Sequence, residues 1–214
     1  MIFRRKQTRT ALRAIGLERF APPFLIAGQI DLDGADLSAV SPLYLGITPN
    51  EADRIRFRKP PAYLLTIENF ASFSRHIVEA DPARLGATLY VGGYPSLATQ
   101  QALRILADAV PDGTPIFHWS DIDPDGTWIF RTIEQAVGRS IRPHLMTPDI
   151  AEALGSAPSM KAPPARCPPE SGIAALAAYL SEDGAKTLEQ EELDPELPEM
   201  LRPRQKVSSD AAAI

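Results

Sequence analysis

Residues 116–130 read IFHWSDIDPDGTWIF, an apolar run of strand length followed by an acidic turn and then by a helix-like pattern. The apolar run is short enough for a buried strand, and residues 128–137 have the spacing of an amphipathic helix. Between them, Asp121, Asp123 and Asp125 occupy alternate positions. Carboxylates this close repel one another in a folded chain unless a cation or hydrogen-bond donors compensate their charge. The stretch therefore predicts a strand–turn–helix unit with an unusual turn.

The same order of strand and helix recurs on both sides of this unit. We predict strands at 62–67, 88–91, 115–119 and 141–146, and helices at 69–80, after the N-cap residue Ser96, and at 128–137. This alternation predicts an α/β fold with a mostly parallel sheet of about four strands and helices on both faces. The loops after the strands then lie along one edge of the sheet, where such folds build their sites.

The chain divides into four predicted regions. Residues 1–60 contain a basic arm, a short strand at 22–31 and a short helix at 49–57, and residues 61–155 form the α/β domain. Residues 156–200 contain a proline-rich loop and a helical extension that includes a helix at 173–180. The small-residue tail 201–214 is expected to be disordered.

Charge is distributed unevenly along the chain. The formal net charge is −5, but the first 20 residues contain six Lys or Arg and one acid. Arg4, Arg5, Lys6 and Arg9 are therefore candidates for binding DNA phosphates, and a solvated terminus is the alternative. No apolar run approaches the roughly 20 residues that span a bilayer, no signal peptide is evident, and the one cysteine, Cys167, suits a reducing compartment. We expect a cytoplasmic protein with no membrane contact.

The acidic turn has three possible interpretations. A calcium-binding EF-hand loop would need Glu at position 132, where the sequence has Thr132, so this interpretation fails. A capping turn would use one Asp at the start of the following helix, where negative charge is favourable. A divalent-metal site would use Asp121 and Asp123 together with Glu68, which ends another predicted strand at the same edge. The last two interpretations remain open from the residues alone.

Four blocks in this order resemble a known family. LLTIENFASF, LYVGGYPS, HWSDIDPDGTWIF and the late LEQEEL (188–193) are similar to the Toprim-containing JetD family, the nuclease subunit of Wadjet plasmid-defence systems, which is related to the topoisomerase VI A subunit. The resemblance covers roughly residues 40–200. It departs from the family pattern at Ser120, where Gly is usual, and in the short segment before the Toprim region.

The resemblance implies a role for each matching residue. Glu68, Asp121 and Asp123 would hold one or two Mg²⁺ or Mn²⁺ ions, and Asp125 would be a weaker ligand. Glu189 and Glu191 match the late acidic block, where they would either bind metal or brace the domain. Among the tyrosines, only Tyr94 lies in a loop at the predicted active edge, although water is the expected nucleophile.

The implied activity is metal-dependent endonucleolytic cleavage of double-stranded DNA within an SMC/kleisin-type complex. The chain has no ATP-binding P-loop motif, so ATP-driven DNA handling would fall to a partner. The resemblance also allows a homodimer. The alternatives are an inactive or truncated docking subunit of the same complex, and another Toprim activity of the primase or topoisomerase type.

Overall fold

The computed structural model describes residues 22–36, 43–157 and 162–201. The predicted DNA-binding residues Arg4, Arg5, Lys6 and Arg9 lie outside the described residues, as does the predicted disordered tail apart from Leu201.

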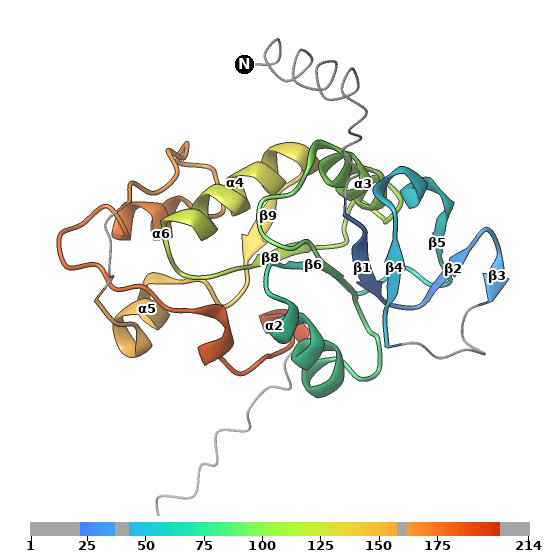
Figure 1. Ribbon diagram of the computed structural model, residues 1–214, viewed down its shortest axis with the longest axis horizontal. Coiled ribbons are helices and arrows are strands. Elements are labelled where there is room, and N and C mark those ends of the chain that lie inside the picture. Colours follow the sequence, from blue (N-terminus) through green and yellow to red (C-terminus); the bar gives the residue numbers. More distant parts are fainter. Residues whose placement is uncertain (1–21, 37–42, 158–161, 202–214) are drawn as a thin grey trace, which may run out of the picture.

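A six-stranded mixed sheet forms the centre of the molecule (Figure 1). Its strands are, in spatial order, β4 (Leu45–Ile47), β1 (Phe24–Ala27), β7 (Ala87–Tyr90), β6 (Leu64–Ile67), β8 (Ile116–Trp119) and β9 (Ile141–Pro143). The four predicted strands form its parallel part, β7-β6-β8-β9, while β1 pairs antiparallel with both β7 and β4. The α/β prediction is thus confirmed, and the sheet has two strands more than predicted.

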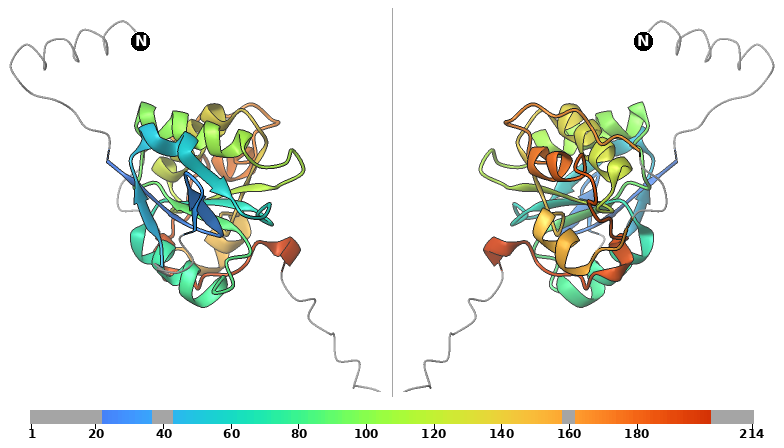
Figure 2. Two further views of the ribbon diagram at one scale, coloured as in Figure 1. Left: turned by 90° about the vertical axis from the view of Figure 1, so that its right-hand side faces the viewer. Right: turned by 90° about the vertical axis from the view of Figure 1, so that its left-hand side faces the viewer.

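Helices cover both faces of this sheet, as predicted. On one face lies α2 (Phe70–Arg75), which continues as a π-helical turn at His76–Ala80. On the other face lie α3 (Leu97–Asp108) and α4 (Pro124–Val137), which pack against each other (Figures 1 and 2). Since β6 and β8 are each covered by helices on both sides, their residues are all buried, and this explains why they are mostly apolar, with Thr66 and His118 as the exceptions.

The C-terminal region adds a helical layer beside α4. It contains α5 (Pro148–Leu154), which the sequence did not predict, and α6 (Ala174–Tyr179), which confirms the helix predicted at 173–180. Two short 3₁₀ turns follow, η4 (Gln190–Glu192) and η5 (Glu199–Leu201). The helix α6 contacts both α4 and α5, so the extension packs onto the α/β unit.

The N-terminal predictions need two corrections. The strand predicted at 22–31 is two strands, β1 and β2 (Ile30–Leu32), and β2 forms a separate antiparallel sheet with β3 (Ala35–Asp36) and β5 (Ile55–Phe57). The helix predicted at 49–57 is a 3₁₀ helix, η2 (Pro49–Arg54), followed directly by β5. The buried Ile55 pairs with Leu32 of β2, and this pairing overrides the helical pattern at the end of the segment.

Two boundaries near the acidic turn also differ from prediction. The helix α4 begins at Pro124 instead of residue 128, because Asp123 caps it and Pro124 suits its first position. The strand predicted at 141–146 ends at Pro143, because Leu145 has a left-handed backbone with φ of 55°.

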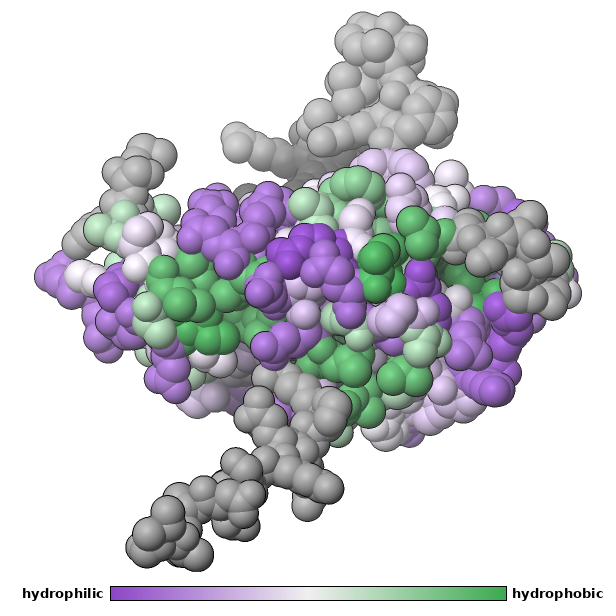
Figure 3. All heavy atoms as spheres, turned by 90° about the horizontal axis from the view of Figure 1, so that it is seen from below, coloured by the Kyte–Doolittle hydropathy of each residue, from purple (hydrophilic) through white to green (hydrophobic). Residues whose placement is uncertain are grey.

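The face that carries α2 has hydrophilic residues between apolar areas (Figure 3). Phe70 and Val78, from α2 and its π-helical turn, are among the exposed apolar side chains. Within the described ranges, no helix has the length and apolar character needed to cross a membrane.

Candidate metal centre

Glu68 and Asp121 lie close together at the point where the strand order of the sheet reverses. The chain leaves β6 towards β7 on one side, whereas β8 leads to β9 on the other, so the carboxyl ends of β6 and β8 border the topological switch point. Ile67 and Trp119, the last residues of these strands, are in register, and the Glu68 N–H donates to the Trp119 carbonyl at 3.0 Å. Glu68 and Asp121 therefore emerge side by side at the edge of the sheet.

The acidic turn gives its three carboxylates different tasks. Asp123 is the N-cap of α4, and its Oδ1 accepts a hydrogen bond of 2.6 Å from the Gly126 N–H. The capping interpretation therefore accounts for Asp123, but not for Asp121. Asp125 lies in the first turn of α4, where its charge suits the helix N-terminus.

Gly126 is required by the close packing of this turn. A Cβ atom at this position would lie 2.1 Å from the Asp121 carbonyl oxygen and 2.9 Å from Ser120 Oγ. No backbone can accommodate such a contact, so any side chain here would displace Asp121 or the first turn of α4. The glycine of the DxDxDG stretch thus keeps the end of β8 against the start of α4.

A segment far along the chain completes the site. Residues 187–191, called here the strap, run beside the acidic turn, and Leu188 pairs antiparallel with Ile122. The Gln190 N–H then donates to Asp121 Oδ1 at 2.7 Å. As a result, one carboxylate oxygen from each of Asp121, Glu189 and Glu191 lies within 4.8 Å of the other two.

Two uncharged residues that the sequence did not single out hold the strap in place. Gln190 is buried, its Nε2 donates to the Trp119 carbonyl at 3.2 Å, and its Oε1 accepts from the Asn69 N–H at 3.0 Å. The Asn69 side chain caps α2 and also donates to Glu191. Their only sequence signals are position: Asn69 directly follows Glu68, and Gln190 lies between two glutamates.

The carboxylates of Glu68, Asp121 and Asp123 lie together without a basic side chain paired with them among the described residues. Burial, followed by the charges of Asp121 and Asp123, raises the pKa of Glu68 to about 7. Burial is also the main cause that raises the pKa of Asp121 to about 6, with a smaller contribution from the charge of Glu189, against the hydrogen bond from Gln190. Burial likewise raises the pKa of Asp123. In the described part of the chain, no Lys or Arg forms an ion pair with these three carboxylates.

The donor set fits a hard divalent cation. Glu68 Oε2 is buried and has no hydrogen-bond partner among the described residues, which is costly for a carboxylate unless a ligand satisfies it. Mg²⁺ and Mn²⁺ take carboxylate oxygens as ligands. In the described residues, Asp121, Glu189 and Glu191 form a group of three carboxylates whose oxygens lie within 4.8 Å of one another, and Glu68 and Asp123 are not members of this group. The strap is therefore as much part of the site as the two strand ends.

Tyr94 lies at the rim of this site. It follows Gly92 and Gly93, which both have left-handed backbones with φ of 65° and 77°. Its hydroxyl donates to Asp125 Oδ1 at 3.1 Å, while its side chain is 55% exposed. Burial of the hydroxyl and the hydrogen bond to Asp125 raise the pKa of Tyr94 to about 12, so the phenol is neutral at physiological pH.

The histidines are buried in the core. His118 Nδ1 lies 2.8 Å from Thr66 Oγ1, and His76 Nε2 lies 3.0 Å from the Tyr63 hydroxyl. Burial lowers the pKa of His118 to about 3 and that of His76 to about 4, so both are neutral. These contacts support a structural role for His76 and His118.

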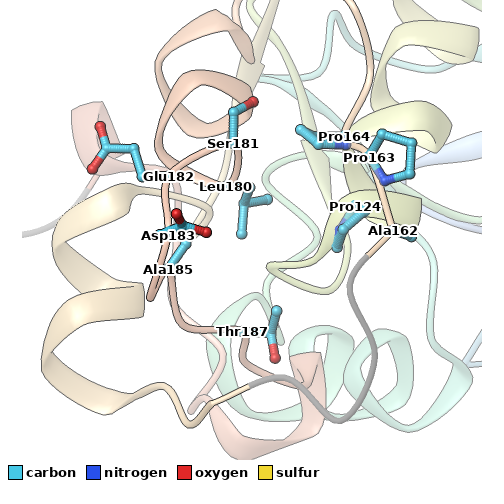
Figure 4. Close-up of a pocket in the computed structure, with 10 residues that line it drawn as sticks. All are labelled: Pro124, Ala162, Pro163, Pro164, Leu180, Ser181, Glu182, Asp183, Ala185 and Thr187. Carbon is cyan, nitrogen blue, oxygen red and sulfur yellow. The ribbon is translucent and has the colours of Figure 1, made fainter.

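A cavity of about 350 Å³ adjoins the site without including its carboxylates (Figure 4). Pro124 of the acidic turn and Thr187 of the strap are among the residues that line it, and Pro163, Pro164 and Leu180 form apolar walls. The carboxylates themselves are outside the cavity, at the edge of the sheet.

Comparison with known proteins identifies one family. The family model described as Wadjet protein JetD, C-terminal, matches residues 31–200, which include every strand of the six-stranded sheet except β1 and also the whole strap. A search among curated proteins gives no match.

Proposed function

Because this chain belongs to the family of the Wadjet protein JetD, C-terminal region, we propose that it is a divalent-metal-dependent DNA endonuclease of an SMC-type plasmid-defence complex. The observation that carries the proposal is the convergence of Glu68, Asp121 and the strap on one edge of the sheet, without a cationic partner among the described residues. Membership of the family implies that the chain works with other components of a Wadjet system.

The proposed roles follow from the contacts. Asp121, Glu189 and Glu191 hold the first Mg²⁺ or Mn²⁺ ion, because their oxygens are already gathered. Glu68 and Asp123 would be the further ligands, since the Glu68 Oε2 atom is buried without a hydrogen-bond partner among the described residues and the charge of Asp123 acts on Glu68. Asp125 is an outer contributor that also fixes Tyr94.

A bound divalent ion would polarise the scissile phosphate and lower the pKa of a bound water molecule. The contribution of the chain itself is position. Gln190 orients Asp121 through its backbone N–H, and Asn69 orients Glu191 through its side-chain amide. Gly126 keeps Asp121 against the first turn of α4. Hydrolysis then joins a water oxygen to phosphorus and breaks one P–O ester bond, with no group of the chain forming a covalent link.

The proposal is tested by Mn²⁺ titration calorimetry with Asp121→Asn. The variant removes one charge from the site while keeping the size of the side chain, and we expect at least a tenfold loss of Mn²⁺ affinity. Because Glu68 and Asp121 have pKa values of about 7 and 6, Mn²⁺ must displace protons at low pH. Affinity of the unmodified chain is therefore expected to rise between pH 5 and 8.

Asp149→Asn is the matched control, because it removes the same carboxylate charge at an exposed position of α5, away from the proposed ligands. It should bind Mn²⁺ as the unmodified chain does. With partner subunits present, plasmid cleavage should be lost in Asp121→Asn and kept in Asp149→Asn. Cleavage that survives in Asp121→Asn would contradict the assignment of the site. Absence of Mn²⁺ binding by the unmodified chain would favour a docking subunit, and nucleotide incorporation would favour a primase-type activity.

The proposed partners are double-stranded DNA and the SMC and kleisin-type subunits of the complex, with a second copy of the chain as a further candidate. Arg4, Arg5, Lys6 and Arg9 remain proposed phosphate contacts. Their contribution is measurable as a lower salt dependence of DNA binding when all four are replaced by Gln.

A further inference from the structure

We infer that the ring of Tyr94 is a stacking platform for a nucleobase next to the phosphodiester cleaved at the proposed metal centre. The inference rests on the proposed function and adds to it a contact with the substrate that involves no metal and no phosphate.

The backbone of the loop after β7 places this ring beside the carboxylates. A Cβ atom at Gly93 would lie 3.9 Å from Glu68 Oε1, so the loop passes beside the Glu68 carboxylate. The next residue, Tyr94, then reaches across to α4, where its hydroxyl donates to Asp125 Oδ1 at 3.1 Å. A ring anchored at the hydroxyl in this way keeps one orientation, which limits the entropy lost when a base stacks on it.

The ring is also available to a ligand. The Tyr94 side chain is 55% exposed, although large apolar side chains are mostly buried in this fold. The aromatic residues of α2 and β7, such as Phe73 and Tyr90, pack on one another instead. In the described part of the chain no ring contact of Tyr94 is seen.

The charge of the site favours stacking over phosphate contacts. Glu68, Asp121 and Asp123 repel any phosphate whose charge is not offset by a bound cation. A neutral phenol adds no repulsion, and every base has a face that can stack on it. Stacking on Tyr94 therefore orients the strand next to the cut without dependence on sequence. Since a paired base inside a duplex cannot reach the ring, cleavage should favour DNA with an unpaired nucleotide beside the cut.

The test is fluorescence anisotropy of a short labelled single-stranded oligonucleotide, with Ca²⁺ as the ion to prevent turnover. Tyr94→Leu removes the aromatic face and is expected to weaken binding roughly 5- to 100-fold. Tyr94→Phe keeps the face but loses the bond to Asp125, and it should stay within about twofold of the unmodified chain. Trp128→Leu is the control, because Trp128 is a partly exposed aromatic residue whose indole N–H donates to Pro163 on the proline-rich loop.

Each outcome decides the inference. Unchanged oligonucleotide binding by Tyr94→Leu would overturn the inference. A loss of affinity in Tyr94→Phe as large as that in Tyr94→Leu would also overturn it, because it would show that the hydroxyl and not the ring matters. No binding by the unmodified chain would also overturn it. The proposed function is tested separately by Mn²⁺ calorimetry and plasmid cleavage. Cleavage with no effect of Tyr94→Leu on binding would contradict only the stacking inference, whereas an effect of Tyr94→Leu without cleavage would contradict only the proposed function.

Discussion

Replacing Glu68 by Gln is expected to stabilise the metal-free protein at pH 8. Burial and the charges of Asp121 and Asp123 raise the pKa of Glu68 from an ordinary 4.5 to about 7. A carboxyl with a raised folded-state pKa contributes its full stability only below the unfolded-state pKa, and this stability is lost as the pH rises through the folded-state value. The unmodified chain therefore loses stability at this residue between pH 4.5 and 7. A neutral glutamine at position 68 does not titrate, so the Glu68→Gln protein does not lose this stability.

The size of this effect follows from the pKa. A change from 4.5 to about 7 corresponds to about 3 kcal/mol, at 1.36 kcal/mol for each tenfold change in proton affinity. Water reaches part of the Glu68 side chain and screens its neighbours' charges, so we expect about 1–2 kcal/mol in the free energy of unfolding. For a protein of this length this is roughly 2–8 °C in Tm.

Urea unfolding followed by circular dichroism, with EDTA present, measures this difference at pH 8 and at pH 4.5. Glu170→Gln is the matched control, because Glu170 is an exposed glutamate in the proline-rich region, and it should change stability at neither pH. Addition of Mn²⁺ at pH 8 should stabilise the unmodified chain more than Glu68→Gln, which has lost a ligand. A Glu68→Gln protein that is less stable than the unmodified chain at pH 8 without metal would refute the electrostatic reasoning. So would a gain of equal size at pH 4.5.

Two further substitutions test the surroundings of the site. Gly126→Ala places a methyl group against the Asp121 carbonyl and should lower the free energy of unfolding by about 1–3 kcal/mol, with at least a tenfold loss of Mn²⁺ affinity. Urea unfolding measures the first effect and calorimetry the second. Unchanged Mn²⁺ binding would show that the turn tolerates the contact. Glu134→Ala leaves Arg131 without its largely buried ion pair and removes the acceptor of the Ser171 hydroxyl, so we expect a loss of about 3 kcal/mol in the free energy of unfolding. A loss below about 1 kcal/mol would mean that the proline-rich loop is not held by this residue.

The parallel part of the fold was predictable because its signals are local. The strands β6, β7 and β8 are short, mostly apolar runs, and each is followed by a segment with helical spacing or a polar turn. The antiparallel strands β1 and β4 were harder to predict, because β1 pairs with β4 and with β7, which are distant in the sequence. Their role in the sheet is set by tertiary contacts that no periodicity in residues 22–47 reveals.

The candidate site was predictable only in its strand-end residues. Glu68 and Asp121 end or closely follow apolar strands, and the parallel topology brings such positions to one edge. The place of Glu189 and Glu191 depends on the bridge between Leu188 and Ile122, two residues whose apolar character carries no information about pairing. Asn69 and Gln190 could not be identified from the sequence, because the hydrogen bonds by which they hold the strap join segments far apart in the chain, and no local pattern reveals such pairing.

The strap also has a consequence for the timing of assembly during synthesis. The last strand of the sheet ends at Pro143, so the whole α/β layer can form on the ribosome before the strap has been translated. Domains generally fold as units during synthesis, and the remaining stretch takes seconds to add. The nascent chain would thus hold Glu68 and Asp121 in place while lacking Glu189, Gln190 and Glu191. In a newly made molecule, the α/β layer would therefore form before Glu189 and Glu191 join Asp121.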